Sequence, residues 1–291
     1  MREKIWSFET SIWHQELVRT ENELVLERFY KGIDLADLNT RIDLLRELAA
    51  PFTTPRVDEL GVCRFQLDTE DTLFNILHSS VAADHILELF YQLGQYLAQV
   101  KVPTPDNADI PTAWKRLEKY LSADYPEEIE DILVILGDDT VAHATTLMER
   151  INQVPEKVVG LGGVGIGGIY VNDGVFVIPC GPEAGVIPIE FDLAWILGEL
   201  TELEHAFLRR GQSGDLVARA GNALVEGYLQ AGRAEIDTEI LTILSALRTL
   251  LHYFDFSMTY PDQFPDDEHC RFVRWLVSRA YSLTVLEESH V

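Results

Sequence analysis

The stretch "VVGLGGVGIGGIYVNDG", residues 158–174, decides between two possible folds for this chain. It holds six of the 19 glycines, followed by an Asn-Asp-Gly turn. Glycines at this spacing open the βαβ unit that binds dinucleotides, in which an α-helix follows the glycines directly. Here two runs of β-branched and aromatic residues, 169–171 and 175–178, flank the Asn-Asp-Gly turn. That pattern predicts a β-hairpin. The dinucleotide-binding alternative requires a helix after Gly168.

Outward from this stretch, the chain divides into a small β-rich part and a large helical part. Strand-like runs fill the first 30 residues, and a helix with Asp34 as its N-cap extends toward Pro51. From about Ala82 apolar residues recur at helical spacing, and the pattern after Phe191 is almost wholly helical. We expect an α+β fold with two lobes, residues 1–78 and 79–291, and a β-hairpin inserted in the helical lobe.

The composition restricts the classes of partner. The chain has 48 acidic and 23 basic residues, a net charge of -25, which disfavours nucleic acids and anionic membrane surfaces. No apolar run is long enough to span a membrane, and the N-terminal segment is charged where a signal peptide is apolar. We expect a soluble cytoplasmic protein. Cys63, Cys180 and Cys270 lack the spacing of metal or redox sites and are predicted to be buried thiols.

The segment "PIEFDLAWILGEL", residues 188–200, resembles a motif of the aminoglycoside phosphotransferase and choline kinase family, whose members are small-molecule kinases. Weaker agreement occurs in the same order at "LVLERFYKG", residues 24–32, and "LGQYLAQVKVPTP", residues 93–105. The resemblance covers most of the chain. It implies a protein-kinase-like fold with a β-rich N-lobe and a helical C-lobe, in which residues 158–192 hold the region of the catalytic loop.

The resemblance also implies that the residues of phosphoryl transfer are replaced. The family's catalytic-loop histidine falls on Leu161, its catalytic aspartate on Gly163, its metal-binding asparagine on Gly168 and its second metal ligand on Pro179. Phosphoryl transfer needs a carboxylate that accepts the hydroxyl proton and oxygen ligands for Mg²⁺, which glycine and proline do not provide. Because residues 157–172 contain no acidic residue, a shifted alignment does not restore the site. We therefore expect no catalytic residue, no metal and no cofactor.

The small lobe leaves one register open. The family's phosphate-binding cation on the third strand falls on Glu27, with Arg28 beside it, and neighbouring strand residues face opposite sides. If Glu27 is correct, its helix partner falls on Arg41, and the two form either a charge-swapped ion pair that braces the lobe or two unrelated surface charges. No glycine precedes Gly32, so the turn that covers the nucleotide phosphates in the family lacks the residue that favours close backbone approach.

Two other groups of polar residues have the composition of metal sites. Residues 266–269, Asp-Asp-Glu-His, precede Cys270, but consecutive residues at a helix start point around its axis, which favours a solvated acidic turn. Glu202, Glu204 and His205 lack the His-Glu-x-x-His spacing. We expect no metal at either group.

These observations predict a pseudokinase, a catalytically inactive phosphotransferase-like protein that acts as a binding, scaffold or regulatory protein. Asp192 matches the aspartate that braces the family's catalytic loop and is expected to be structural. The alternative is a small-molecule phosphotransferase with displaced carboxylates, for which Glu183 is the nearby candidate. Since the chain is strongly acidic, with Glu202, Glu204 and residues 266–268 in the helical lobe, we expect a basic protein partner or a small cationic ligand in the interlobe cleft.

Overall fold

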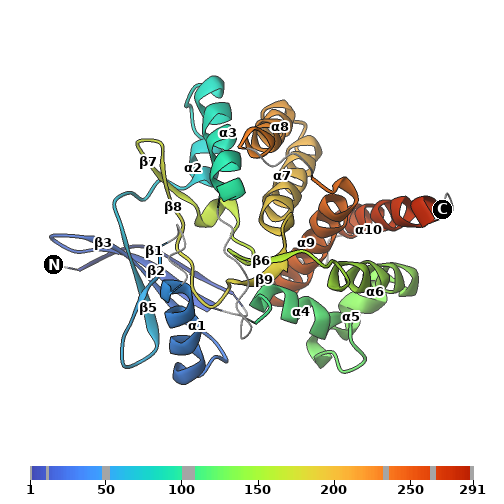
Figure 1. Ribbon diagram of the computed structural model, residues 1–291, viewed down its shortest axis with the longest axis horizontal. Coiled ribbons are helices and arrows are strands. Elements are labelled where there is room, and N and C mark those ends of the chain that lie inside the picture. The colour runs from blue at the N-terminus through green and yellow to red at the C-terminus, as the bar shows by residue number, and fades with distance from the viewer. Residues whose placement is uncertain are drawn as a thin grey trace.

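The computed structural model describes residues 2–10, 13–47, 53–99, 109–231, 236–262 and 267–288. Figure 1 shows two lobes: a five-stranded sheet with one helix, and a larger, mostly helical part that contains two small two-stranded sheets. The predicted α+β fold, with a β-rich N-lobe and a hairpin inserted in a helical C-lobe, is confirmed.

The N-lobe is an antiparallel sheet in the order β1-β2-β3-β5-β4. Its elements are β1 (Glu3–Glu9), β2 (Trp13–Arg19), β3 (Leu24–Tyr30), α1 (Leu35–Glu47), β4 (Arg56–Val57) and β5 (Val62–Leu67). Asp34 begins α1 as predicted, since its carboxylate accepts the N–H of Asp37 at 2.9 Å.

Alternation along β3 decides which side chains enter the N-lobe core. Leu26 and Tyr30 are buried in a cluster with Leu38 and Ile42 of α1. Tyr170, from the hairpin of the C-lobe, belongs to the same cluster. The inner face of the sheet therefore packs on both α1 and the C-lobe.

The C-lobe is built from helices around a short stretch of strands. The helices are α2 (Leu73–Leu77), α3 (Ala83–Gln99), α4 (Thr112–Leu121), η1 (Glu127–Ile129), α5 (Glu130–Leu136), α6 (Asp138–Asn152), α7 (Phe191–Arg209), α8 (Asp215–Gln230), α9 (Thr238–Thr259) and α10 (Asp267–Glu288). Between α6 and α7 lie β6 (Lys157–Gly160), the turn η2 (Ile166–Gly168), β7 (Tyr170–Asn172), β8 (Val175–Val177) and β9 (Gly185–Pro188). Strand β6 pairs with β9, and β7 pairs with β8, both antiparallel.

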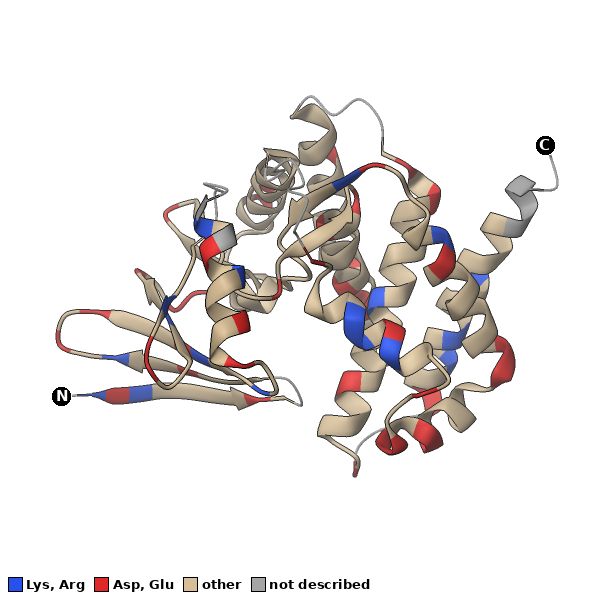
Figure 2. Ribbon diagram, turned by 60° about the horizontal axis from the view of Figure 1, so that its bottom comes forward, with Lys and Arg blue, Asp and Glu red and all other residues tan. Residues whose placement is uncertain are grey.

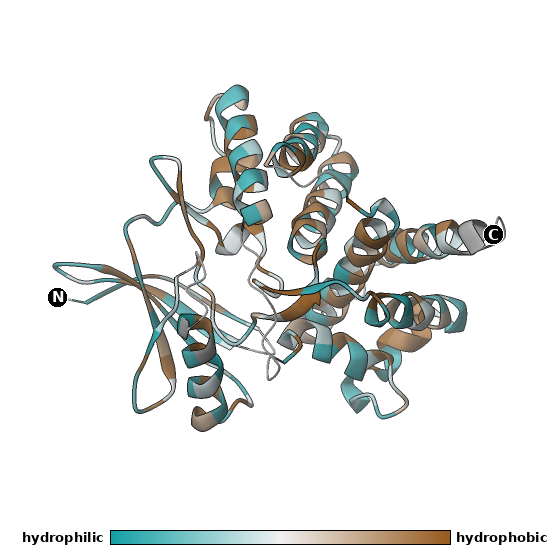
Figure 3. Cartoon of the chain, viewed as in Figure 1, coloured by the Kyte–Doolittle hydropathy of each residue, from teal (hydrophilic) through white to brown (hydrophobic). Residues whose placement is uncertain are grey.

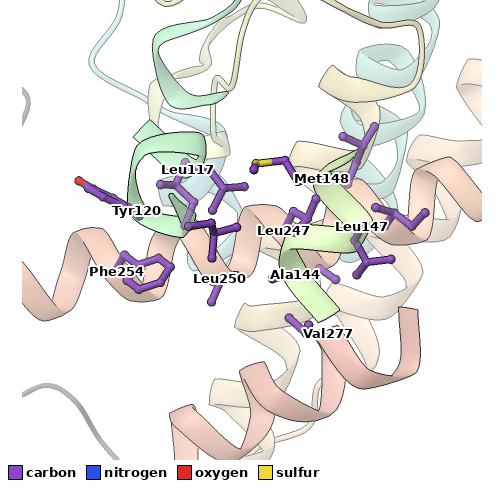
Figure 4. Packing of buried hydrophobic residues seen from close by; sticks show 14 of the residues in the cluster. Leu117, Tyr120, Ala144, Leu147, Met148, Leu247, Leu250, Phe254 and Val277 are labelled. Carbon is purple, nitrogen blue, oxygen red and sulfur yellow. The ribbon is translucent and has the colours of Figure 1, made fainter. Parts of the chain in front are cut away.

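Two apolar clusters hold the C-lobe together. One surrounds α9, where Leu247, Leu250 and Phe254 pack against side chains of α4, α6 and α10 (Figure 4). The other joins α3, α7 and α8 to the glycine-rich stretch. Figure 3 shows the corresponding hydrophobic stripes on helices whose other sides are hydrophilic, as expected for helices that bury one face.

Charged residues are spread over both lobes, with Asp and Glu more frequent than Lys and Arg (Figure 2). Among the helices in the described ranges, none combines the length and apolar character that a membrane span requires. All three cysteines are buried and free, as predicted.

Candidate functional site between the lobes

The glycine-rich stretch forms a loop, a short turn and a hairpin. Strand β6 ends at Gly160, η2 spans Ile166–Gly168, and β7 and β8 follow around the turn at Asp173, which has a φ of 47°. The hairpin prediction is confirmed. Because β7 occupies the place where a dinucleotide site has its helix, the dinucleotide-binding alternative is wrong.

The backbone amides of this loop bind carboxylates of α7. The N–H groups of Leu161 and Gly162 donate to the two oxygens of Asp192 at 2.8 and 3.2 Å, and the N–H of Ile166 donates to Glu199 at 2.7 Å. Asp192 and Glu199 are seven positions apart on α7, which places them on one face two turns apart. Helix α7 therefore holds both ends of the loop, and Asp192 lies where the resemblance placed a bracing residue.

The positions matched to the catalytic residues are used for packing. Leu161 is 1% exposed, and a Cβ at Gly163, whose φ is 112°, would lie 2.9 Å from the Trp195 ring. The N–H of Gly168 closes the turn η2 on the carbonyl of Gly165 at 2.9 Å. Pro179 is buried, and forms a parallel bridge with Thr53 of the N-lobe.

The structure brings the segment that contains Pro179 close to Leu161. The thiol of Cys180, next to Pro179, lies 3.7 Å from the carbonyl of Leu161. Gly168 is instead near α2, because the following residue, Ile169, accepts the N–H of Leu73 at 2.8 Å. The turn η2 therefore separates Gly168 from Leu161 and Gly163.

Arg28, rather than Glu27, faces the C-lobe and forms a buried ion pair with Glu183. Arg28 is 6% exposed, and its Nη1 donates to Oε1 of Glu183 at 2.5 Å. The hydroxyl of Tyr30 donates to the same oxygen at 2.7 Å, and the N–H of Gly181 donates to Oε2 at 2.9 Å. The carboxylate of Glu183, between the lobes, therefore accepts three hydrogen bonds.

Aromatic rings and one amide complete the surroundings of Arg28. Its guanidinium carbon lies 4.9 Å from the ring centre of Trp13 and 5.5 Å from that of Phe65, and its Nε donates to the amide oxygen of Gln15 at 3.1 Å. Burial opposes the charge of Arg28, but its interactions with Tyr30 and Glu183 outweigh burial and raise the pKa of Arg28. Burial also raises the pKa of Tyr30 well above its ordinary value, so the hydroxyl remains a donor.

Of the two alternatives for Glu27 and Arg41, an ion pair or two unrelated charges, the structure has the second. The strand alternation directs Glu27 to the outer face of the sheet, where it pairs with Arg2 at 2.6 Å and Arg64 at 3.0 Å. Helix α1 packs on the opposite face, and its Arg41 reaches Asp109 beyond the N-lobe at 2.9 Å. Arg41 still braces the lobes, with a different partner.

A second, partly buried carboxylate lies inside the helical lobe, at the junction of α7, α9 and α10. Glu202 accepts hydrogen bonds from Arg248 and from Nδ1 of His252, the latter at 2.6 Å, and lies 2.9 Å from Nε2 of His269. The predicted solvated turn therefore fits Asp267 and Glu268, which are exposed, but not His269, because α10 turns its imidazole inward. Asp266 lies outside the described residues.

Sequence reasoning missed the pairing of Arg28 with Glu183 and the role of Glu199. Glu183 was noted only as the carboxylate nearest the emptied loop, and 155 positions separate it from Arg28. Glu199 offered a local signal, since it lies seven residues after Asp192 within the segment that carried the resemblance.

Several solved structures of small-molecule kinases have a similar fold. A spectinomycin phosphotransferase, solved with ADP and spectinomycin, is 14% identical over 96% of this chain and 92% of that chain, with a TM-score of 0.55. An amicoumacin kinase, solved with AMP-PNP and Ca²⁺, is 12% identical over 96% and 88%, with a TM-score of 0.65. A choline kinase from Cryptosporidium parvum is 10% identical over 99% and 90%, with a TM-score of 0.59.

No protein-family profile and no curated protein matches the sequence. At identities of 10 to 14% the likeness shows the fold alone. The protein-kinase-like fold of the aminoglycoside phosphotransferases and choline kinases, implied by residues 188–200, is confirmed across nearly the whole chain.

Proposed function

We propose that this protein is a pseudokinase: it has the fold of a small-molecule phosphotransferase, does not transfer phosphate, and acts by binding a partner. The observation that carries the proposal is the buried ion pair of Arg28 and Glu183. It joins the third strand of the N-lobe to the segment that follows the C-lobe hairpin. The positive charge of Arg28, which a bound phosphate would otherwise use, is neutralised by Glu183 of the same chain.

The residues present do not fit a magnesium nucleotide. The positions matched to metal ligands, Gly168 and Pro179, have no side-chain oxygen, and Mg²⁺ is held by oxygen ligands. Both oxygens of Glu183 already accept hydrogen bonds, and Arg28 is engaged by Glu183. A nucleotide would have to separate a buried ion pair before it could use Arg28, which is costly because each charge would lose its partner.

The glycine loop supports the same conclusion. Backbone N–H groups in a glycine-rich loop are suited to anions. Here Leu161, Gly162 and Ile166 donate these groups to Asp192 and Glu199. The loop therefore binds the carboxylates of its own helix α7 where a phosphate loop binds its ligand.

A phosphotransferase with displaced residues would need a carboxylate that is free to bind a metal or accept a proton. Glu183 is the nearest one, but it is 8% exposed and receives three donors. Its hydrogen bonds favour the binding role over catalysis.

Thermal unfolding with Mg-ATP tests the proposal. A ligand at a hundred times its dissociation constant stabilises a protein by about 2.7 kcal/mol, which shifts the melting temperature of a chain this long by several degrees. We expect no shift with millimolar Mg-ATP, while a choline kinase measured alongside shifts. A reproducible, magnesium-dependent shift that Glu183→Gln abolishes would contradict the proposal and identify Glu183 as a displaced metal ligand.

A further inference from the structure

Helices α3 and α8 lie side by side on the C-lobe, on the side away from α5 and α6 (Figure 1). A Cβ at Gly94 would overlap the carbonyl of Leu224, and a Cβ at Gly227 would overlap the carbonyl of Tyr91. The two backbones therefore touch at this crossing, which only glycine permits. From the crossing, a groove between the helices extends toward the start of α3.

The groove has a volume of about 370 Å³. Each helix contributes four residues at positions i, i+3, i+4 and i+7, so one face of each helix forms one wall. Leu87 and Tyr91 of α3 and Ala223 of α8 are half-buried and form an apolar floor. A groove walled by one face of each of two helices suits a rod-like ligand.

The rim of the groove is acidic. Asp84, Glu88 and Glu226 line it and are exposed. Arg219 is the one cation among the described residues of the lining, and its Nη1 lies 3.7 Å from Asp215 on the same helix. The rim therefore presents an excess of negative charge around an apolar floor.

We propose that this groove docks a basic amphipathic helix of a partner protein. A third helix fits between two helices when its apolar side chains recur at i, i+3, i+4 and i+7, and they would cover Leu87, Tyr91 and Ala223. Lysines or arginines beside that stripe would lie against the acidic rim, which favours association and selects the partner. A second copy of this chain is a poor occupant, since each copy has a net charge of -25.

This inference specifies the surface for the proposed binding role and rests on that role. It also corrects an expectation about the helical lobe: Glu202, expected to attract a basic partner, is partly buried and already pairs with Arg248 and His252. The α3–α8 groove offers exposed carboxylates together with an apolar floor, which Glu202 does not.

A designed peptide tests the groove. The probe is a helix of about 18 residues, long enough to hold helical structure, with leucines at i, i+3, i+4 and i+7 and lysines elsewhere. Its dissociation constant is measured by fluorescence anisotropy at physiological salt. Two variants change the groove: Glu88→Lys with Glu226→Lys reverses the rim charge, and Ala223→Trp fills the floor without changing charge. Glu128→Lys in η1 with Glu149→Lys in α6, both at exposed positions, makes the same change of net charge elsewhere.

We expect both groove variants to weaken binding about tenfold or more and the distant double variant to change it less than about twofold. All variants are first checked for unchanged melting temperature. No measurable binding, equal weakening by the distant variant, or unchanged binding to Ala223→Trp would each overturn the proposal. The Mg-ATP measurement is independent, so failure of the groove leaves the inactive-kinase proposal standing, and failure of that proposal does not alter the peptide result.

Discussion

At the scale of single residues, close contact explains the first four glycines of residues 158–174. A Cβ at Gly162, whose φ is 74°, would overlap the carbonyl of Glu183, and a Cβ at Gly165 would lie 2.7 Å from the carboxylate of Glu199. A positive φ and the lack of room both select glycine. The loop closes tightly on Glu183 and α7, so Gly162 and Gly165 serve the chain's own packing.

The substitution Gly162→Ala is therefore expected to be destabilising. Alanine at a φ of 74° is strained, and its methyl group would have to displace the segment that carries Glu183. We expect a loss of at least about 2 kcal/mol in the free energy of unfolding, measured by urea denaturation.

Gly167→Ala is the matched control, since a Cβ at Gly167 meets nothing within 4 Å and its φ lies outside the left-handed region. We expect it to change the free energy of unfolding by less than about 1 kcal/mol. Equal losses for the two variants would mean that general loop flexibility, and not contact at Gly162, requires glycine here.

At the scale of elements, α7 connects the loop to the helical bundle. Asp192 and Glu199 hold the loop, and Glu202, one turn further, meets Arg248 and His252 of α9. Burial acts to raise the pKa of Glu202, but the charges of His252 and Arg248 outweigh burial and hold that pKa well below its ordinary value of 4.5. Glu202 is therefore ionised in the folded protein under ordinary conditions.

Glu202→Gln tests this junction through its pH dependence. Glu202→Gln leaves the buried Arg248 without its carboxylate partner, so we expect a loss of about 3 kcal/mol at neutral pH. Because the folded pKa of Glu202 is lowered, its contribution is present above about pH 4.5 and is lost as the pH falls through the folded pKa. Urea denaturation across a pH series should show the gap between wild type and variant narrowing below about pH 4.5.

Glu149→Gln, at an exposed position of α6, is the control and is expected to change stability by less than about 0.5 kcal/mol at each pH. A gap between wild type and Glu202→Gln that stays constant down to acid pH would contradict the ionised state of Glu202 in the folded protein.

Elements were more predictable from the sequence than the contacts between them. The apolar stripe of α3 and the N-cap Asp34 of α1 are local patterns, and the hairpin at residues 170–177 follows from its turn. The register of β3 was ambiguous, because a one-residue slip exchanges Glu27 and Arg28 between faces. The partner of Arg28 lies 155 positions away, and no local pattern specifies such a pair.

At the scale of the whole molecule, several contacts tie the lobes together. Arg28 pairs with Glu183, and Arg41 pairs with Asp109. The backbone N–H of Thr53 donates to the carbonyl of Ile178 at 3.0 Å, and the N–H of Cys180 donates to the carbonyl of Thr53 at 2.9 Å. The hairpin also places Tyr170 in the N-lobe core. These ties make the interlobe surface part of the folded core.

A double-mutant cycle on Arg28 and Glu183 measures the buried tie. Arg28→Met leaves Glu183 as an uncompensated buried charge, and Glu183→Gln does the same to Arg28, so each single variant is expected to lose about 3 kcal/mol in the free energy of unfolding. In the double variant no charge is left unpaired. We expect its loss to be smaller than the sum of the single losses by more than about 1 kcal/mol, measured by urea denaturation.

The outcome separates a structural tie from a site held ready for a ligand. If Arg28 and Glu183 only hold the two lobes together, their coupling energy is large. Glu183→Gln then does not create Mg-ATP binding, because Gly168 and Pro179 still offer no metal ligand. Lys31 and Glu9 form an exposed pair at 2.8 Å, and a cycle on them, as the control, should show much weaker coupling than the cycle on Arg28 and Glu183. Additive losses at Arg28 and Glu183, together with nucleotide binding by Glu183→Gln, would instead mean that Glu183 blocks a working phosphate site.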